Sequence, residues 1–230
     1  MCVNYFPVSN KVLEEQFLAR LITPEESPTE AWKGQFAAML VKHRQTGERV
    51  ATQARFGLLP HFAQEVRYAD KTYNARMETV AELPSYKPAW TASRFCLIPM
   101  CGFCEPCYES GQPERWQIGM EDDAAFAVAG IWSWWRNPHT QQGEASFSML
   151  TINADEHPLM RRFHAPGDEK RMPVIIHPEN YDRWLSATPE QARALAQPFP
   201  ADLMRSLAAP LPKLKQPSPN FSLFDEPEPV

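Results

Sequence analysis

The sequence predicts a single α+β domain in which a compact, strongly curved sheet is flanked by a few short helices. Short stretches of alternating apolar and polar residues recur along the chain, and this period of two is typical of strands. Helical patterns are few. The 230 residues suit one large domain or two small ones, and no internal repeat divides them. Many short strands with few helices favour the single domain.

The elements are expected in the following order. Ser9 caps a helix, because a serine oxygen accepts hydrogen bonds from the amides of the first turn. The apolar face of this helix comprises Val12, Leu13, Phe17 and Leu21. Residues 24–34 are typical of a loop, and Arg49–Leu59 alternates as a strand does. Further short strands are expected at Phe95–Ile98, Trp116–Met120, Phe126–Ile131, Phe147–Ile152 and Met172–Ile176.

Two helices are expected to close the domain. The first spans Glu179–Ser186, and the second begins at Thr188, where Thr188-Pro189-Glu190-Gln191 has the spacing of a capping box. From residue 211 onward the chain is rich in proline and short of core residues. The sequence therefore predicts a folded domain over residues 1–210 and a disordered tail over residues 211–230.

Composition limits the functional classes. No apolar run approaches the roughly 20 residues that span a bilayer, and the start lacks a basic region followed by an apolar one. Five cysteines, an odd number, favour free thiols in a reducing cytoplasm. Because the formal net charge is −5, nucleic-acid binding would require a local basic patch. We expect a cytoplasmic monomer without a membrane segment or a cofactor.

Cys2 is the residue with the most distinctive chemistry. Removal of Met1 would place a free amine and a thiol on the same residue. Such a 1,2-aminothiol condenses with an aldehyde to an imine, which the thiol then closes to a thiazolidine. The closure is intramolecular and so has an effective concentration of roughly 10⁵ M or more. The amine, with a pKa of about 8, is partly nucleophilic near neutral pH.

The remaining cysteines suggest an alternative. Cys101, Cys104 and Cys107 are spaced like half of a zinc site, with Cys96 just before them. This run reads as a strand and its end, and alternation along it would send Cys101 and Cys104 to opposite faces. No second pair of ligands follows, so no metal site is expected.

Four segments, taken together and in order, resemble the SRAP family of SOS-response-associated proteins. They are Cys2, residues 73–79 (YNARMET), residues 99–106 (PMCGFCEP) and residues 161–173, which contain Arg161-Arg162-Phe163-His164 and Lys170-Arg171-Met172-Pro173. Residues 56–60 (FGLLP) add to the resemblance, which runs from residue 2 to about residue 185. It implies a β-barrel-like α+β fold with a basic groove and a covalent crosslink between the N-terminal cysteine and abasic sites in single-stranded DNA. Abasic single-stranded DNA is thus the expected partner.

The resemblance also assigns the site. Cys2 would be the nucleophile, Glu105 the acid and base, His164 a holder of a proton or phosphate, and Asn74 the residue that orients the Cys2 amine or the sugar. The expected DNA contacts are Asn4, Phe56, Arg76, Arg161, Arg162 and Arg171. Phe56 is favoured for base stacking over Trp90, Phe103 and Trp132. The alternative for Arg76 is a salt bridge to Glu78, two residues along.

Two further possibilities remain open. The family is also described as peptidases, so the alternative is a cysteine peptidase site formed by Cys2, Glu105 and His164, with hydrolase or lyase activity. The start also departs from the family pattern, because Val3-Asn4 replaces the usual Gly-Arg.

In the tail, Asn220-Phe221-Ser222-Leu223-Phe224 resembles the short motif by which bacterial repair proteins dock on the sliding clamp.

Overall fold

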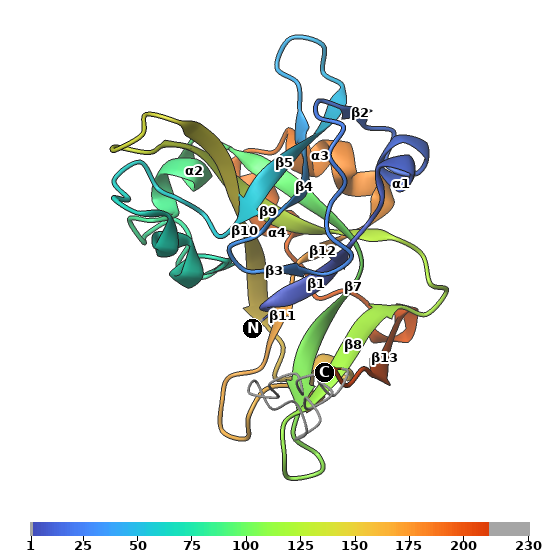
Figure 1. The fold of residues 1–230 in the computed structure, drawn as a ribbon. Helices are drawn as coiled ribbons and strands as arrows, with labels where there is room; N and C mark the ends of the chain where they lie inside the picture. Colours follow the sequence, from blue (N-terminus) through green and yellow to red (C-terminus); the bar gives the residue numbers. More distant parts are fainter. Residues whose placement is uncertain (1, 212–230) are drawn as a thin grey trace, which may run out of the picture.

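The computed structural model describes residues 2–211, and Figure 1 shows a sheet that curls on itself with helices on its outside. Within these residues thirteen strands join into one sheet. Its path is β12 (Ile175–Ile176), β9 (Phe126–Arg136), β10 (Gly143–Asn153), β5 (Arg49–Phe56), β4 (Phe36–Lys42), β7 (Phe95–Cys107), β1 (Asn4–Pro7) and β3 (Ala31–Trp32).

An additional pairing between β7 and β9 closes five of these strands into a barrel, in the order β9, β10, β5, β4 and β7. Closure leaves no free edge on these strands. The smaller strands attach around the barrel: β2 (Arg20–Leu21) beside β5, β6 (Asn74–Arg76) and β11 (Arg171–Pro173) beside β10, and β8 (Glu114–Met120) between β7 and β13 (Met204–Ala208). The expected curved α+β fold is confirmed.

The helices are short. They are α1 (Asn10–Glu15), α2 (Lys87–Thr91), α3 (Tyr181–Leu185) and α4 (Pro189–Leu195), with 3-10 segments at Val66–Lys71, Met160–Arg162, Pro178–Asn180 and Ala201–Leu203. Both expected caps are present: Ser9 accepts from the amide of Val12, and Thr188 and Gln191 form a reciprocal capping box. Among residues 2–211 the helices are all too short or too polar to cross a membrane.

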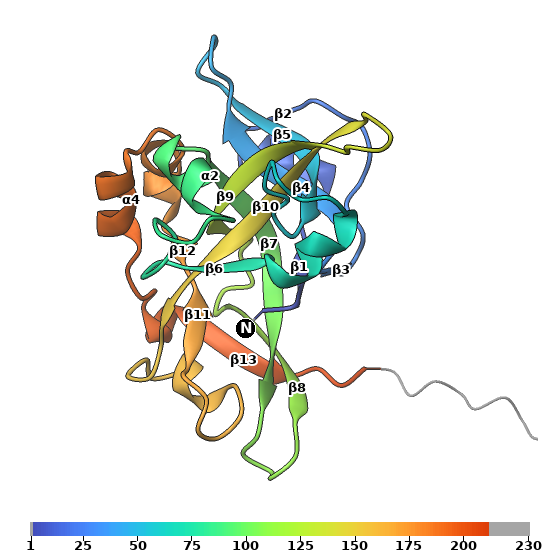
Figure 2. The same ribbon diagram turned by 90° about the vertical axis from the view of Figure 1, so that its left-hand side faces the viewer.

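Strand β7 is much longer than the expected Phe95–Ile98. Pro99, Gly102 and Pro106 are poor strand residues, so the local pattern ends the strand early. In the structure β7 pairs with β9 along its first half and with β1 and β8 along its second half, and these partners hold it extended. It therefore runs out of the barrel toward β8, as Figure 2 shows, and carries Glu105 to its far end. The loop expected at residues 24–34 contains β3.

The sheet is buried on both faces. One apolar cluster packs the barrel strands against α1, α2 and α3, with Leu13, Trp90 and Trp184 among its members. The other lies on the opposite face and contains Cys2, Phe56, Phe103 and Phe147. Neighbouring residues of one strand, such as Leu97 and Ile98, divide between the two clusters. Cys2 thus lies in an apolar layer.

Candidate active site at the N-terminal cysteine

Cys2 lies two residues before the start of β1, which pairs antiparallel with β7 through Tyr5 and Phe103. This pairing brings the start of the chain to the half of β7 that carries Glu105. Cys2 is only 1% exposed, and its thiol donates a hydrogen bond to the carbonyl of Asn4 at 3.2 Å. Burial, and next the nearby Glu105 carboxylate, raise the pKa of the Cys2 thiol well above its usual value. The sulfur is therefore a protonated thiol at neutral pH.

Asn74 holds the backbone of Cys2. Its Nδ2 donates to the carbonyl oxygen of Cys2 at 2.8 Å. Strand β6 fixes Asn74 by pairing in parallel with β10, where Asn74 lies opposite Met149. The hydroxyl of Tyr86 donates to the Asn74 carbonyl at 2.9 Å and adds a second restraint. Asn74 thus joins the start of the chain to the barrel.

Glu105 is 2% exposed, close to the end of β7. Burial raises the pKa of its carboxyl to about 7, because a charged carboxylate loses solvation in an apolar layer. A group with this pKa carries a proton about half of the time near neutral pH. Such a carboxyl can both give and take a proton, as a general acid and base must.

His164 lies against Glu105. Its backbone has φ of 68°, in the left-handed region, and its amide donates to the carbonyl of Pro106 at 2.8 Å. This bond ties the residue to the end of β7. Its Nδ1 is 3.4 Å from Oε2 of Glu105, and its Nε2 is 3.0 Å from the carbonyl of Arg171. Burial lowers the pKa of His164 to about 4, so the ring is neutral at pH 7.

These contacts locate the proton between Glu105 and His164. A carbonyl only accepts, so Nε2 of His164 carries the hydrogen that points to Arg171. In the neutral ring Nδ1 then has a lone pair facing Glu105. A proton between the two groups therefore belongs to the carboxyl. The geometry and both pKa directions agree that Glu105, not His164, is the acid at neutral pH.

The expected basic residues do not form one surface. Arg161 is exposed, while Arg162 is half-buried and forms a bidentate pair with Glu109 at 2.8 and 2.9 Å. A cleft of about 790 Å³ lies between them and His164, and Lys170 also lines it. Through His164, which lines the cleft, this cleft lies next to Glu105.

Arg171, an expected DNA contact, is buried and bound within the protein. It is 2% exposed and its guanidinium binds Glu78, Glu169 and the carbonyl of Thr151 at 2.7–2.8 Å. The short strand β11 turns this side chain inward, away from the surface on which a DNA contact was expected. Its role in the site is to present its carbonyl to His164.

Arg76 remains available as a surface cation. Its side chain is 49% exposed and pairs with Glu169 at 2.7 Å. The expected alternative partner, Glu78, instead binds Arg171. A partner from a distant loop could not be read from local spacing.

Two further expected DNA contacts are buried. Phe56 is fully buried and stacks on Phe147 with ring centres 5.4 Å apart, so it cannot receive a base. Trp90 and Phe103 are buried as well. Asn4 is 2% exposed, and its side-chain amide binds Glu30. Of the four aromatic candidates, Trp132 alone keeps a partly exposed ring.

The other cysteines do not gather around a metal. Cys101 is exposed, whereas Cys96, Cys104 and Cys107 are buried. Residues 2–211 contain no group of three or more histidine, cysteine, aspartate or glutamate side chains placed to hold an ion. Cys104 lies near Cys2, and burial raises its pKa to about 11.

Sequence reasoning missed Tyr86 and the carbonyl of Arg171. Tyr86 lies just before α2 and contacts Asn74 only through the fold, and no motif marks it. A backbone carbonyl leaves no signal in sequence.

Comparison with known proteins places this site in context. The family model "SOS response associated peptidase (SRAP)" matches residues 1–209. The abasic site processing protein YoqW of Bacillus subtilis (strain 168) is 31% identical over 158 residues, which cover 66% of each chain, just under two thirds. The abasic site processing protein HMCES of Pongo abelii is 25% identical over 175 residues, 63% of this chain and 48% of that one.

Solved structures agree on the fold. A crystal structure of a Bordetella bronchiseptica protein has a TM-score of 0.83 and 32% identity, and covers 91% of this chain and 100% of its own. A second, from Bacteroides thetaiotaomicron, has a TM-score of 0.78 at 19% identity, and covers 90% and 91% of the two chains.

Proposed function

The chain belongs to the SRAP family, and from this we propose that it processes abasic sites in DNA. Two matched relatives are named abasic site processing proteins. The proposal is a DNA-repair role in the cytoplasm, close to the chromosome and without a metal or organic cofactor.

We further propose that the protein acts by covalent capture. After loss of Met1, the Cys2 amine would add to the aldehyde of a ring-opened abasic sugar and give a carbinolamine. Loss of one water would give an imine. The Cys2 thiol would then add across the C=N bond, with its hydrogen transferred to nitrogen, to close a thiazolidine. The adduct would shield the site from strand-breaking elimination.

The observation that carries this proposal is the hydrogen bond from Asn74 to the carbonyl of Cys2 at 2.8 Å. Residues at a chain terminus are poorly ordered unless they are tied down. Here a buried amide from a barrel-attached strand fixes the residue that would become the terminus. Such restraint suits a terminal amine that must meet an aldehyde in one orientation.

Glu105 supports the same chemistry. An abasic deoxyribose is mostly a closed hemiacetal, so a proton must move before the aldehyde is free. The hydroxyl group of the carbinolamine must then be protonated by an acid so that it leaves as water and the imine forms. A carboxyl with a pKa of about 7, close enough to Cys2 to raise the pKa of its thiol, can supply both steps.

The cleft beside His164 would receive the flanking strand. Arg161 and Lys170 line it and can contact phosphates, and Arg76 is a further exposed cation. Asn4, Phe56 and Arg171 take no part in this proposal because they are buried.

A cysteine peptidase is the less favoured alternative. Such an enzyme needs a thiolate activated by a basic histidine. Burial here raises the pKa of the Cys2 thiol and lowers that of His164 to about 4, which is the opposite arrangement. An aminothiol that attacks first through its amine does not need a thiolate.

The sliding clamp is proposed as a second partner. Residues 220–224 (NFSLF) lie outside the described residues, and their sequence is the only support. A titration of the 213–230 peptide with the clamp tests it against the same peptide carrying Leu223→Ala and Phe224→Ala. Equal binding of both peptides would remove this partner and leave the capture proposal untouched.

The capture proposal is tested with single-stranded DNA that carries one abasic site. Wild-type protein should give a heat-stable adduct on a denaturing gel. Cys2→Ser should give at most a reversible imine, because a hydroxyl closes the ring less readily than a thiol. Cys101→Ser, at the exposed cysteine of β7, is the matched control and should crosslink like wild type. A stable adduct with Cys2→Ser would disprove the mechanism.

A further inference from the structure

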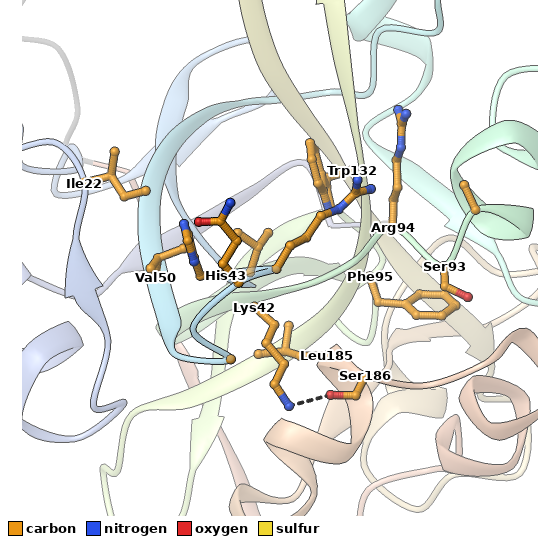
Figure 3. A pocket seen from close by; sticks show the side chains of 15 residues that line it. Ile22, Lys42, His43, Val50, Ser93, Arg94, Phe95, Trp132, Leu185 and Ser186 are labelled. Carbon is orange, nitrogen blue, oxygen red and sulfur yellow. Dashed lines mark hydrogen bonds between the residues drawn. The ribbon is translucent and has the colours of Figure 1, made fainter.

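A second cavity, separate from the Cys2 site, has a volume of about 680 Å³. It lies between the turn that joins β4 to β5, the residues before β7, the middle of β9 and the end of α3 (Figure 3). Neither Cys2, Asn74, Glu105 nor His164 lines it. Its volume falls within the range of small-ligand pockets, about 300–1,000 Å³.

The charged groups that line this cavity are all basic. They are Lys42, Arg44 and Arg94, with His43 beside them, and no lining residue is acidic. In a chain of net charge −5, such a concave basic surface is a local feature. Within residues 2–211, neither Arg44 nor Arg94 forms an ion pair.

The acids nearby are already neutralised. Arg49 binds the Asp182 carboxylate through two hydrogen bonds of 2.8 Å. These bonds lower the pKa of Asp182, and the nearby Lys42 lowers it further. Glu48 pairs with Arg20. The positive charge of the cavity is therefore available to a ligand.

The cavity also has an aromatic wall. Trp132 is partly exposed, and the Arg94 guanidinium lies 5.7 Å from the centre of its ring. Figure 3 shows Trp132 and Arg94 on one side of the cavity and Lys42 on the other. A flat ring next to an arginine is a surface on which nucleic-acid bases stack. Val50, Phe95 and Leu185 supply an apolar lining.

The hydrogen-bond donors on the other side are positioned by the fold. Nζ of Lys42 donates to Oγ of Ser186 at 2.7 Å and keeps its other hydrogens (Figure 3). Nδ1 of His43 accepts from the amide of Thr46 at 3.3 Å. In the neutral ring this places the hydrogen on Nε2, so His43 is a donor as well.

We propose that this cavity binds one nucleotide, with its phosphate against Lys42 and Arg44 and its base against Trp132 and Arg94. The same chemistry is offered by a free nucleotide and by one unit of a single strand. We infer the strand, a step that rests on the proposed function. A strand held here as well as at Cys2 would have two separate points of attachment on the protein.

The test measures binding of thymidine monophosphate, inorganic phosphate and an undamaged oligothymidylate to the full chain. Undamaged DNA has no aldehyde, so the result does not depend on capture by Cys2. The variant is Arg44→Gln with Arg94→Gln. Arg136→Gln is the matched control, since Arg136 is exposed, has no ion pair within residues 2–211 and does not line the cavity.

The double variant should bind both the nucleotide and the oligonucleotide about tenfold more weakly. It should also lower the salt slope for the oligonucleotide by about 0.7, as expected for the loss of the Arg44 contact to a phosphate of a single strand. The control should match wild type. Quenching of tryptophan fluorescence by the nucleotide should disappear in Trp132→Phe if the base stacks on this ring.

Other outcomes overturn the proposal in part or in whole. If the double variant loses binding of the nucleotide but not of the oligonucleotide, the ligand of this cavity is a free nucleotide and not a DNA strand. Equal binding of phosphate and nucleotide, with quenching intact in Trp132→Phe, would exclude base stacking. Wild-type binding of every ligand by the double variant would disprove the site.

Discussion

Asn74 donates a hydrogen bond to the backbone carbonyl of Cys2 at 2.8 Å, across 72 positions of sequence. The amide nitrogen comes from β6, which pairs with the long barrel strand β10. This contact makes the position of Cys2 depend on the barrel and not on the first residues of the chain alone.

Replacing Asn74 should therefore slow capture. Asn74→Leu leaves the Cys2 carbonyl without its buried donor, a loss of about 1–3 kcal/mol, or roughly 5- to 160-fold in rate if the contact orients the reacting amine. The rate is measured in a single turnover at saturating abasic DNA. Tyr86→Phe, which removes only the contact to the Asn74 carbonyl, should have a smaller effect. A folded Asn74→Leu protein with the wild-type rate would remove Asn74 from the site.

Glu105→Gln should slow adduct formation by roughly 10²- to 10⁴-fold, the usual contribution of a general acid or base. Glutamine keeps the shape of the side chain and cannot exchange a proton. Noncovalent binding should be unchanged, which anisotropy with undamaged DNA measures. Glu15→Gln, at an exposed carboxylate of α1 that pairs with Lys11, is the control. Equal rates for both variants would show that Glu105 moves no proton.

The same carboxyl should make stability depend on pH. Its pKa is raised in the folded state, from 4.5 to about 7, so its stabilising contribution is complete below about pH 4.5 and is lost as the pH rises through 7. By pH 8 the free energy of unfolding loses on the order of 3 kcal/mol from Glu105, because each unit of pKa shift corresponds to about 1.36 kcal/mol. His164, whose pKa is lowered to about 4, has the opposite dependence in an overlapping range.

Comparison with Glu105→Gln isolates the Glu105 contribution. Urea unfolding at pH 5 and pH 8 should show the variant gaining stability over wild type as the pH rises. Parallel pH profiles for the two proteins would contradict the raised pKa.

Arg76→Ala should weaken DNA binding without slowing the chemical step at saturation. Arg76 is half-exposed and pairs with Glu169, so the protein loses little stability with it. The salt slope of binding to single-stranded DNA should fall by about 0.7, the value for one phosphate contact. Arg67→Ala, at an exposed arginine paired with Glu65, is the control. An unchanged slope would exclude a phosphate contact.

Local patterns in the sequence predicted much of the fold. The caps at Ser9 and Thr188 and the alternation in β5 involve neighbours in sequence, and the structure has them. Strand β7 was predicted too short, because its prolines and Gly102 are unfavourable locally and only pairing with β1, β8 and β9 holds them extended. The closure of the barrel by β7 and β9 could not be predicted from either strand alone.

The candidate site, like the fold, could be predicted from the sequence only in part. The sequence indicated Cys2, Asn74, Glu105 and His164, and the fold brings them together. It gave no signal that Arg171 faces inward, because an arginine in a short strand suits either face, whereas Phe56 lies on the same side of β5 as Ala54 and both are buried. Asn4 is also buried, since β1 lies between β3 and β7 and Glu30 binds its amide. Exposure of a single side chain depends on partners that are distant in sequence.

The central claim is that Cys2, as the terminal residue, is consumed in a covalent bond to the abasic sugar. Intact mass spectrometry after incubation with single-stranded DNA bearing one abasic site tests it most directly. We predict that the free protein lacks Met1 and that the adduct has the summed mass of protein and DNA minus one water, stable to heat. Peptide mapping should place the modification on Cys2. Unmodified protein, or an adduct on any other residue, would contradict the mechanism.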